Sequence, residues 1–242
     1  MELNYQKLGL KKDYLYEVLA ITYNIFKDKI IPNTSCMGIR LIEDKLIKIS
    51  PYHSTVTFKN LKLNKFISLN FVDNIYLYAL ASLKESHSKI GLNKFPENYY
   101  GFLEVDKNIV TEKISNKIVD SKKLYIPFIN EAWGVLICEA IEEEEIVKEN
   151  NLGKSILSEF NLIIKKVMKL KESYNLFNRA ENLTLESIIL ATRLKLAHEK
   201  KDQILYSKFK GMIDINIKDV RRFGKNLNAL KAIDLIEKFI KI

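Results

Sequence analysis

The stretch Ser50–Asn74, SPYHSTVTFKNLKLNKFISLNFVDN, decides both the expected fold and the expected site. It places a polar segment between one apolar run and another. Phosphate oxygens accept hydrogen bonds from hydroxyl, amide and ammonium groups. This segment offers all three kinds of donor, in Ser54, Thr55, Thr57, Lys59, Asn60 and Lys62. The stretch therefore predicts a phosphate-binding loop.

A purely structural explanation of these residues stays open. Hydroxyl side chains that follow a proline are typical of turns, and Thr55 and Thr57, which alternate with Val56, also fit a β-strand. Two further segments flank the loop in the sequence: CMGIR precedes it at Cys36–Arg40, and SLNFVDN overlaps its end at Ser68–Asn74.

A third segment, FNRAENLTLESIILATRL, occupies Phe177–Leu194. In this order the three segments resemble a mainly archaeal family of FMN-binding split-barrel proteins, long filed as a domain of unknown function. The resemblance covers the ends of the chain better than Ser86–Ser173. Two positions depart from the family pattern, because Cys36 replaces a proline and Val56 replaces an arginine that often lies between the loop hydroxyls. Lys59 or Arg40 would then be the positive partner of the phosphate.

The resemblance implies an α+β fold with FMN as cofactor. A split β-barrel would occupy residues 1–150, and a C-terminal helical domain would occupy residues 151–242. In such proteins barrel-loop hydroxyls hold the phosphate and the flavin ring lies along a groove, commonly at a dimer interface, so we expect a homodimer.

The same resemblance assigns site residues. Thr55, Thr57 and Asn60 would hold the phosphate, with Ser54 and Lys59 as further members. Met37 and Gly38 would bring the backbone close to the ring, because glycine has no side chain in the way. Asn70 and Asp73 would line the same groove.

The implied function is a flavin reductase-like oxidoreductase, in which the flavin supplies the redox chemistry between NAD(P)H and an unknown small-molecule acceptor. No residue is identified as catalytic. Two other functions stay open: a non-catalytic module that carries or senses flavin, and a basic nucleic-acid-binding protein. The last rests on charge, since the formal net charge is +9 and residues 151–242 hold 19 basic and 10 acidic residues.

Composition and missing motifs exclude several other classes of protein. Two cysteines, Cys36 and Cys138, are too few for a disulfide scaffold, and no apolar run reaches the roughly 18 residues of a membrane helix. We therefore expect a soluble, cytoplasmic protein. The chain has no dinucleotide-binding glycine motif, P-loop, serine-hydrolase elbow or Cys-x-x-Cys pair, and no histidine pair with metal-ligand spacing, so we expect no metal.

Hydrophobic periodicity predicts a barrel followed by helices. Strands are expected at Tyr14–Tyr23, Cys36–Ile42, Lys45–Ile49, Phe66–Phe71, Tyr100–Asp106 and Trp133–Ile141. Helices are expected at Ile75–Lys84, at Gly153–Lys171 and over residues 205–242, where Gly211 and Gly224 are possible breaks. The acidic run Glu142–Glu145 is expected to be a solvated boundary.

A polar stripe runs along the expected helix at Phe177–Leu196. At about 100° per residue, Arg179, Asn182, Glu186 and Arg193 fall together between two leucine flanks. We expect this stripe to lie against another element, either in a buried ion-pair network or in contact with a bound anion. Arg179, Asn182 and Arg193 are thus further candidate cofactor ligands, and His53 is the one histidine worth testing.

Overall fold

The computed structural model describes residues 5–27, 29–84, 94–106, 123–150, 153–173, 178–223 and 226–241. Contacts divide the chain into two compact units. The first comprises Met1–Val72 and Glu97–Ser173, and the second comprises Asp73–Pro96 and Tyr174–Ile242. The helices of the described ranges are all too short or too polar to cross a membrane.

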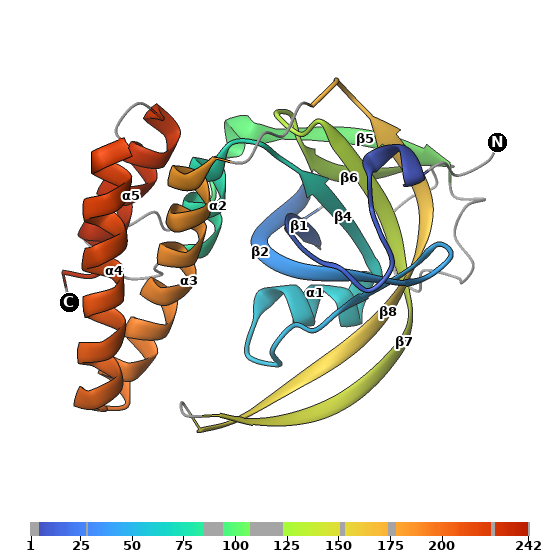
Figure 1. The fold of residues 1–242 in the computed structure, drawn as a ribbon. Helices are drawn as coiled ribbons and strands as arrows, with labels where there is room; N and C mark the ends of the chain where they lie inside the picture. The colour runs from blue at the N-terminus through green and yellow to red at the C-terminus, as the bar shows by residue number, and fades with distance from the viewer. Residues whose placement is uncertain are drawn as a thin grey trace. The chain divides into compact units, whose positions relative to one another are not determined.

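The first unit is built on a closed barrel with the strand order β1-β2-β3-β8-β7-β4 (Figure 1). Its neighbouring strands are antiparallel throughout. The strands are β1 (Leu15–Phe26), β2 (Lys29–Glu43), β3 (Leu46–Ile49), β4 (Phe66–Phe71), β7 (Gly134–Asn150) and β8 (Gly153–Lys169). Helix α1 (Val56–Asn64) lies between β3 and β4 in the sequence, and a 3-10 turn, η1 (Tyr5–Leu8), precedes β1. The expected strands at the start of the chain and the α+β class are confirmed.

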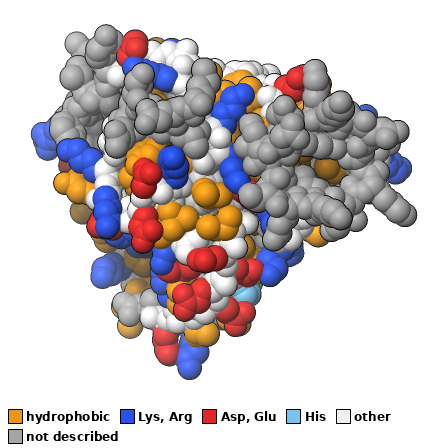
Figure 2. All heavy atoms as spheres, turned by 90° about the vertical axis from the view of Figure 1, so that its right-hand side faces the viewer, with side chains coloured by type: hydrophobic (Ala, Val, Ile, Leu, Met, Phe, Trp, Pro, Cys, Tyr) orange, Lys and Arg blue, Asp and Glu red, His pale blue; other side chains and the backbone are white. Residues whose placement is uncertain are grey.

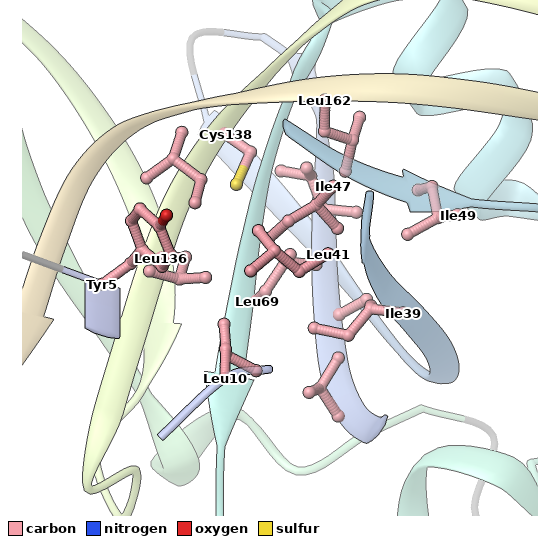
Figure 3. Close-up of a cluster of buried hydrophobic side chains, with 14 of the residues drawn as sticks. Tyr5, Leu10, Ile39, Leu41, Ile47, Ile49, Leu69, Leu136, Cys138 and Leu162 are labelled. Carbon is pink, nitrogen blue, oxygen red and sulfur yellow. The ribbon is translucent and has the colours of Figure 1, made fainter. Parts of the chain in front are cut away.

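Alternate residues of the barrel strands point inward and form one apolar core (Figure 3). Its members include Ile39, Leu41, Ile47, Leu69, Leu136, Cys138 and Leu162. Both cysteines are free thiols, and burial raises the pKa of the Cys138 thiol far above its ordinary value. Cys36 is half-buried, and its thiol donates to Glu17 Oε2 at 3.4 Å.

A second, two-stranded sheet packs on the outer side of β4 and β1. It consists of β5 (Tyr100–Asp106), which follows the 3-10 turn η2 (Glu97–Tyr99), and β6 (Lys123–Ile129). The hydroxyl of Ser68 donates to the backbone oxygen of Pro127 at 2.6 Å, and the hydroxyls of Thr34 and Tyr100 are also 2.6 Å apart. Burial raises the pKa of Tyr100 to about 12, despite the hydrogen bond to Thr34. All six residues of β4 are therefore buried, as expected for a strand covered on both sides.

The expected helix at Gly153–Lys171 is wrong, because this segment forms strand β8. Its apolar residues satisfy a period of 3.6, but Phe160, Leu162 and Ile164 also alternate, and these three point into the core. Pairing with β7 along the whole strand provides the backbone hydrogen bonds that decide between the two periods. The acidic run Glu142–Glu145 lies inside β7 rather than at a boundary, and the Glu143 side chain is partly buried.

The second unit contains the remaining helices. They are α2 (Ile75–Ser82), α3 (Arg179–Glu199), α4 (Gln203–Phe223) and α5 (Leu227–Phe239). The expected helix after residue 75 is confirmed, and α4 continues through Gly211 without a break. The other expected break, Gly224, lies outside the described residues.

The polar stripe of α3 is exposed rather than packed against another element. Arg179, Asn182, Glu186 and Arg193 all face solvent in this chain. The buried residues of α3 include small side chains, Ala180, Thr184, Ser187 and Ala191, together with Ile188, Leu190 and Leu194. Small residues let neighbouring helices approach closely, and the Thr184 and Ser187 hydroxyls donate to backbone oxygens one turn earlier. The stripe is therefore not buried within its own unit, and its contact with another element or an anion stays a prediction.

The ion pair between Lys165 and Glu139 gives a first prediction. The Lys165 ammonium lies 2.9 Å from Glu139 Oε2, and only 3% of the Glu139 side chain is exposed. Lys165→Met leaves a buried carboxylate without this cation, so we expect it to lower the free energy of unfolding by about 3–5 kcal/mol. Chemical denaturation measures this change.

The matched control is the ion pair between Lys48 and Glu159 on the same barrel, 2.6 Å apart but partly exposed. Lys48→Met should lower the free energy of unfolding by no more than about 1 kcal/mol. If Lys165→Met and Lys48→Met lowered the free energy of unfolding equally, burial would not be what makes the loss of Lys165 costly.

Candidate functional site

Helix α1 begins at the hydroxyl-rich segment. Thr55 is its N-cap: the backbone there is extended, and Thr55 Oγ1 accepts a hydrogen bond from the Phe58 N–H. The same hydroxyl donates to the backbone oxygen of Tyr52 at 2.7 Å. Thr57 lies in the first helical turn, so the alternative that Thr55–Thr57 forms a strand is wrong. Serine and threonine are preferred N-caps because they satisfy first-turn N–H groups.

A polar cluster joins the start of α1 to β2. Thr57 Oγ1 lies 3.0 Å from the hydroxyl of Ser35 and accepts from the Asn33 amide at 3.2 Å. Thr57 is only 2% exposed, whereas Asn33 and Ser35 are half-buried, so the cluster reaches the surface at its edge. Sequence reasoning missed Asn33 and Ser35. They stand two positions apart just before CMGIR, and extending the strand alternation toward the N-terminus would have placed them on one face.

One turn further along α1, Asn60 binds β1, the strand that pairs with β2. Its amide donates to Thr22 Oγ1 on β1 at 3.2 Å, and both residues are buried. Thr57 and Asn60 thus face the barrel wall, whereas Ser54 and Lys59 face solvent. No described residue forms an ion pair with Lys59, while the ammonium of Lys62 is engaged by Glu143 Oε2.

Arg40 is not brought to this cluster. It lies on β2 five residues beyond Ser35, roughly 17 Å along an extended strand, and on the opposite face of that strand. Its guanidinium donates to the backbone oxygen of Asp13 at 3.3 Å. Lys59 is therefore the better placed of the two basic groups that the sequence offers to a phosphate at α1.

Met37 and Gly38 lie between Ser35 and Arg40 on the same strand. The Met37 side chain packs against the barrel core. Gly38 pairs with Glu17 on β1, and a Cβ at Gly38 would lie 3.1 Å from Leu15 Cδ1. The side chains of Leu15 and Glu17 thus lie over Gly38 on the outer surface of β2.

The Asn70 side chain is hydrogen-bonded to backbone groups of its own unit. Its amide nitrogen donates to the backbone oxygens of Leu19 and Ser68 at 3.0 and 3.1 Å, and its oxygen accepts from the Ile129 N–H at 2.8 Å. These bonds tie β1, β4 and β6 together and occupy both ends of the amide. Asp73, by contrast, is exposed at the start of the second unit, directly before the α2 N-cap Asn74.

The remaining candidates lie in the second unit. Arg179, Asn182 and Arg193 share the exposed face of α3. They stay predictions as cofactor ligands. No group of three or more His, Cys, Asp or Glu side chains in the described parts of the chain could hold a metal ion.

A second polar network fixes the segment that leads into α1. His53 Nε2 lies 2.8 Å from Ser158 Oγ, and the Ser158 hydroxyl donates to Glu143 Oε1 at 2.8 Å. Because the hydroxyl has one proton, His53 Nε2 must carry its own and donate to Ser158. The His53 ring also stacks on Phe58 at 4.2 Å. The geometry gives His53 a structural task at the start of α1.

This network predicts a pH dependence of stability. Burial alone would raise the pKa of the Glu143 carboxyl, but hydrogen bonds from Lys62 and Ser158 and the nearby charges outweigh it and hold that pKa below its ordinary value. A carboxyl with a lowered folded-state pKa stabilises the fold above its unfolded-state pKa and loses that contribution as the pH falls through the folded-state value. Glu143→Gln should therefore show a smaller loss of stability than wild type below about pH 4.5.

Urea unfolding at pH 7, 5, 4 and 3 measures this difference. Glu144→Gln is the control, because Glu144 is a neighbouring exposed carboxylate. If the free energy of unfolding changed with pH equally in wild type and Glu143→Gln, protonation of Glu143 would not be coupled to folding.

Comparisons with known proteins place this geometry in a family. A family model described as "Protein of unknown function (DUF447) N-terminal domain" matches residues 16–136. The crystal structure of FMN-bound protein MM1853 from Methanosarcina mazei aligns with a TM-score of 0.68 and 16% identity, covering 98% of this chain and 100% of that chain. No curated protein matches the chain.

Two further solved structures are less similar. Flavin reductase HpaC complexed with NADP+ has 12% identity and a TM-score of 0.41, covering 70% of this chain and 87% of its own. An FMN-binding protein from Thermus thermophilus has 14% identity and a TM-score of 0.38, covering 64% and 72%. The Methanosarcina mazei structure confirms the expected fold, and the family match, which spans half of the sequence, shows that this chain belongs to the DUF447 family.

Proposed function

We propose that this protein binds FMN and holds the phosphate of FMN at the first turn of α1. The observation that carries the proposal is the gathering of polar groups at that turn: Ser54 before the cap, the Thr57 cluster beneath, and the exposed ammonium of Lys59. The Thr55 hydroxyl is used by the cap itself. The free N–H groups of a first helical turn and the positive end of the helix dipole also favour a phosphate.

The family comparison supports FMN over other phosphate compounds. The protein from Methanosarcina mazei is described as FMN-bound, and its whole length aligns with this chain. The residues at the start of α1 fit that cofactor, because they supply hydroxyl, amide and ammonium donors and no carboxylate within residues 54–60.

The flavin ring would extend from the phosphate over β2. Met37 lies two residues beyond Ser35 and therefore on the same face of that strand. Gly38 lies on the opposite face, where a Cβ would be 3.1 Å from Leu15 Cδ1. In this proposal Asn70 acts indirectly, since its hydrogen bonds hold β4 and β6 in place rather than reaching a ligand. A homodimer that completes the groove remains our expectation.

Binding of FMN to purified protein tests the proposal. Thr57→Val removes one hydroxyl at nearly constant volume, and Lys59→Gln removes one charge, so each should weaken FMN binding about tenfold or more. Quenching of flavin fluorescence on titration measures the dissociation constants. Thermal unfolding of each variant checks that it still folds.

Lys62→Gln is the matched control, because it removes a lysine from the same helix whose ammonium is already engaged by Glu143. We expect FMN affinity within about twofold of wild type. Equal weakening by Lys59→Gln and Lys62→Gln would mean that general charge, and not the first turn of α1, attracts the flavin.

We also propose a redox activity for the FMN-loaded protein. Bound flavin supplies hydride and electron transfer, which would make the protein an NAD(P)H oxidoreductase with an unknown acceptor. Steady oxidation of NADH or NADPH by FMN-loaded protein would support this activity. FMN binding without any oxidation of either nicotinamide would instead support a flavin carrier.

Nucleic-acid binding remains an alternative because of the net charge of +9. Among the described side chains on the face seen in Figure 2, acidic and basic ones lie side by side with apolar ones. Salt-dependent binding to nucleic acid by a protein without flavin affinity would favour this alternative.

A further inference from the structure

His53 lies directly before the first turn of α1, where the phosphate site is proposed. Its backbone N–H donates to the backbone oxygen of Ile156 on β8 at 3.1 Å. Its ring stacks on Phe58 in the first turn of the helix, with the ring centroids 4.2 Å apart and the planes 19° from parallel. Only Ser54 separates His53 from the cap residue Thr55. A charge on this ring therefore acts close to any anion bound at that turn.

The two nitrogens of the His53 ring have different surroundings. Nε2 donates to Ser158 Oγ at 2.8 Å, because the Ser158 hydroxyl uses its own proton for Glu143. A neutral ring then has no proton on Nδ1. Glu145 Oε2 lies 3.8 Å from Nδ1, and neither of these two atoms can donate a hydrogen bond while the ring is neutral. A second proton on the ring would turn this contact into an ion pair.

The charged groups around the ring are unbalanced while the ring is neutral. Glu143 and Glu145 on β7 contribute two carboxylates, and Lys62 on α1 contributes one ammonium, which pairs with Glu143. On β8, Glu159 is paired with Lys48 on the opposite face of the strand. Among the groups beside the ring, one negative charge thus remains near the start of α1. Protonation of the ring would balance it.

This negative charge bears on the binding of a phosphate. A phosphate monoester carries close to two negative charges near pH 7, so an unbalanced carboxylate beside its site repels it. The ammonium of Lys59 is exposed on α1 and belongs to the proposed phosphate site itself. The side chains of His53 and Glu145 are 28% and 64% exposed, so solvent weakens the repulsion without abolishing it.

We propose that His53 is a positioning residue of the phosphate site, and that its ring takes up a proton when FMN binds and then pairs with Glu145. This inference rests on the proposed FMN site at α1. Binding and protonation favour each other by the same factor, because the coupling between two sites is reciprocal. Imidazole changes charge between about pH 5 and 8, so the contribution of His53 to FMN affinity should fall as the pH rises over that range.

Fluorescence titration of FMN at several pH values between about 5.5 and 8 tests the coupling in wild type and His53→Gln. Glutamine keeps an N–H that can donate to Ser158 but cannot gain a charge. We expect wild type to bind FMN about fivefold more tightly than His53→Gln at the lowest pH, and equally at the highest. Comparing the two proteins at each pH cancels the ionisation of the FMN phosphate itself. Riboflavin, which has no phosphate, should show no such difference.

Two neighbouring carboxylates on β7 provide a matched pair of variants. Glu145→Gln removes the partner of the second proton, so its pH profile should approach that of His53→Gln. Glu144→Gln removes a carboxylate from the opposite face of the same strand, so it should keep the pH profile of wild type.

Calorimetry of FMN binding to wild-type protein gives a measurement that needs no variant. At about pH 7.5 the phosphate of free FMN is almost fully ionised, so net proton uptake, measured in buffers of different ionisation enthalpy, reports on the protein. Binding of FMN without proton uptake would overturn this inference and leave the FMN site in place, as would the same pH profile in wild type and His53→Gln. Absence of FMN binding at every pH would instead overturn the proposed function, and this inference with it.

Discussion

The hydrogen bonds that hold α1 against the barrel wall are the constraint on which the proposed site depends. Thr57 is bonded to Asn33 and Ser35 on β2, and Asn60 is bonded to Thr22 on β1. Leaving such a buried polar group without its partner costs about 1–3 kcal/mol. The two side chains project from successive positions on one face of the helix, so together they fix its rotation and its height on the barrel. The first turn of α1 is therefore presented in one orientation.

The segment before α1 is held just as firmly. His53 reaches β8 through Ser158, and Ser158 reaches β7 through Glu143. Backbone bonds from His53 and Ser158 join the same segment to the hairpin. The long β7–β8 hairpin is thus a support for the helix start, which explains why a histidine in the middle of the polar stretch has a structural rather than a catalytic environment.

Local patterns predicted the parts of the fold that depend on local contacts. The β2–β3 hairpin, β4 and α2 follow from apolar patterns, turn residues and one short apolar helix face. Strand β8 could not be predicted in this way, because its apolar residues fit both periods and only pairing with distant β7 decides between them. The burial of α3 also depends on tertiary contacts: Leu190 and Leu194, on one leucine flank of the stripe, are buried together with the small residues opposite, whereas the stripe itself is exposed.

The same distinction holds for the candidate site. The sequence identified the hydroxyls and Lys59 correctly as neighbours, since they lie within one helical turn of each other. It could not show that Thr57 and Asn60 point toward the barrel, because their partners are 24 and 38 residues away in the chain. For Asn70 the sequence likewise could not show that its amide is hydrogen-bonded to backbone groups of three strands, and its place in the flavin groove stays a prediction.

The most direct test of the account compares the affinities of wild-type protein for FMN and for riboflavin, which lacks only the phosphate. If the first turn of α1 holds the phosphate through charge-assisted bonds, FMN should bind about a hundredfold more tightly than riboflavin, and the difference should shrink as salt is added. Equal affinities for the two flavins would contradict the central claim that this turn is a phosphate site.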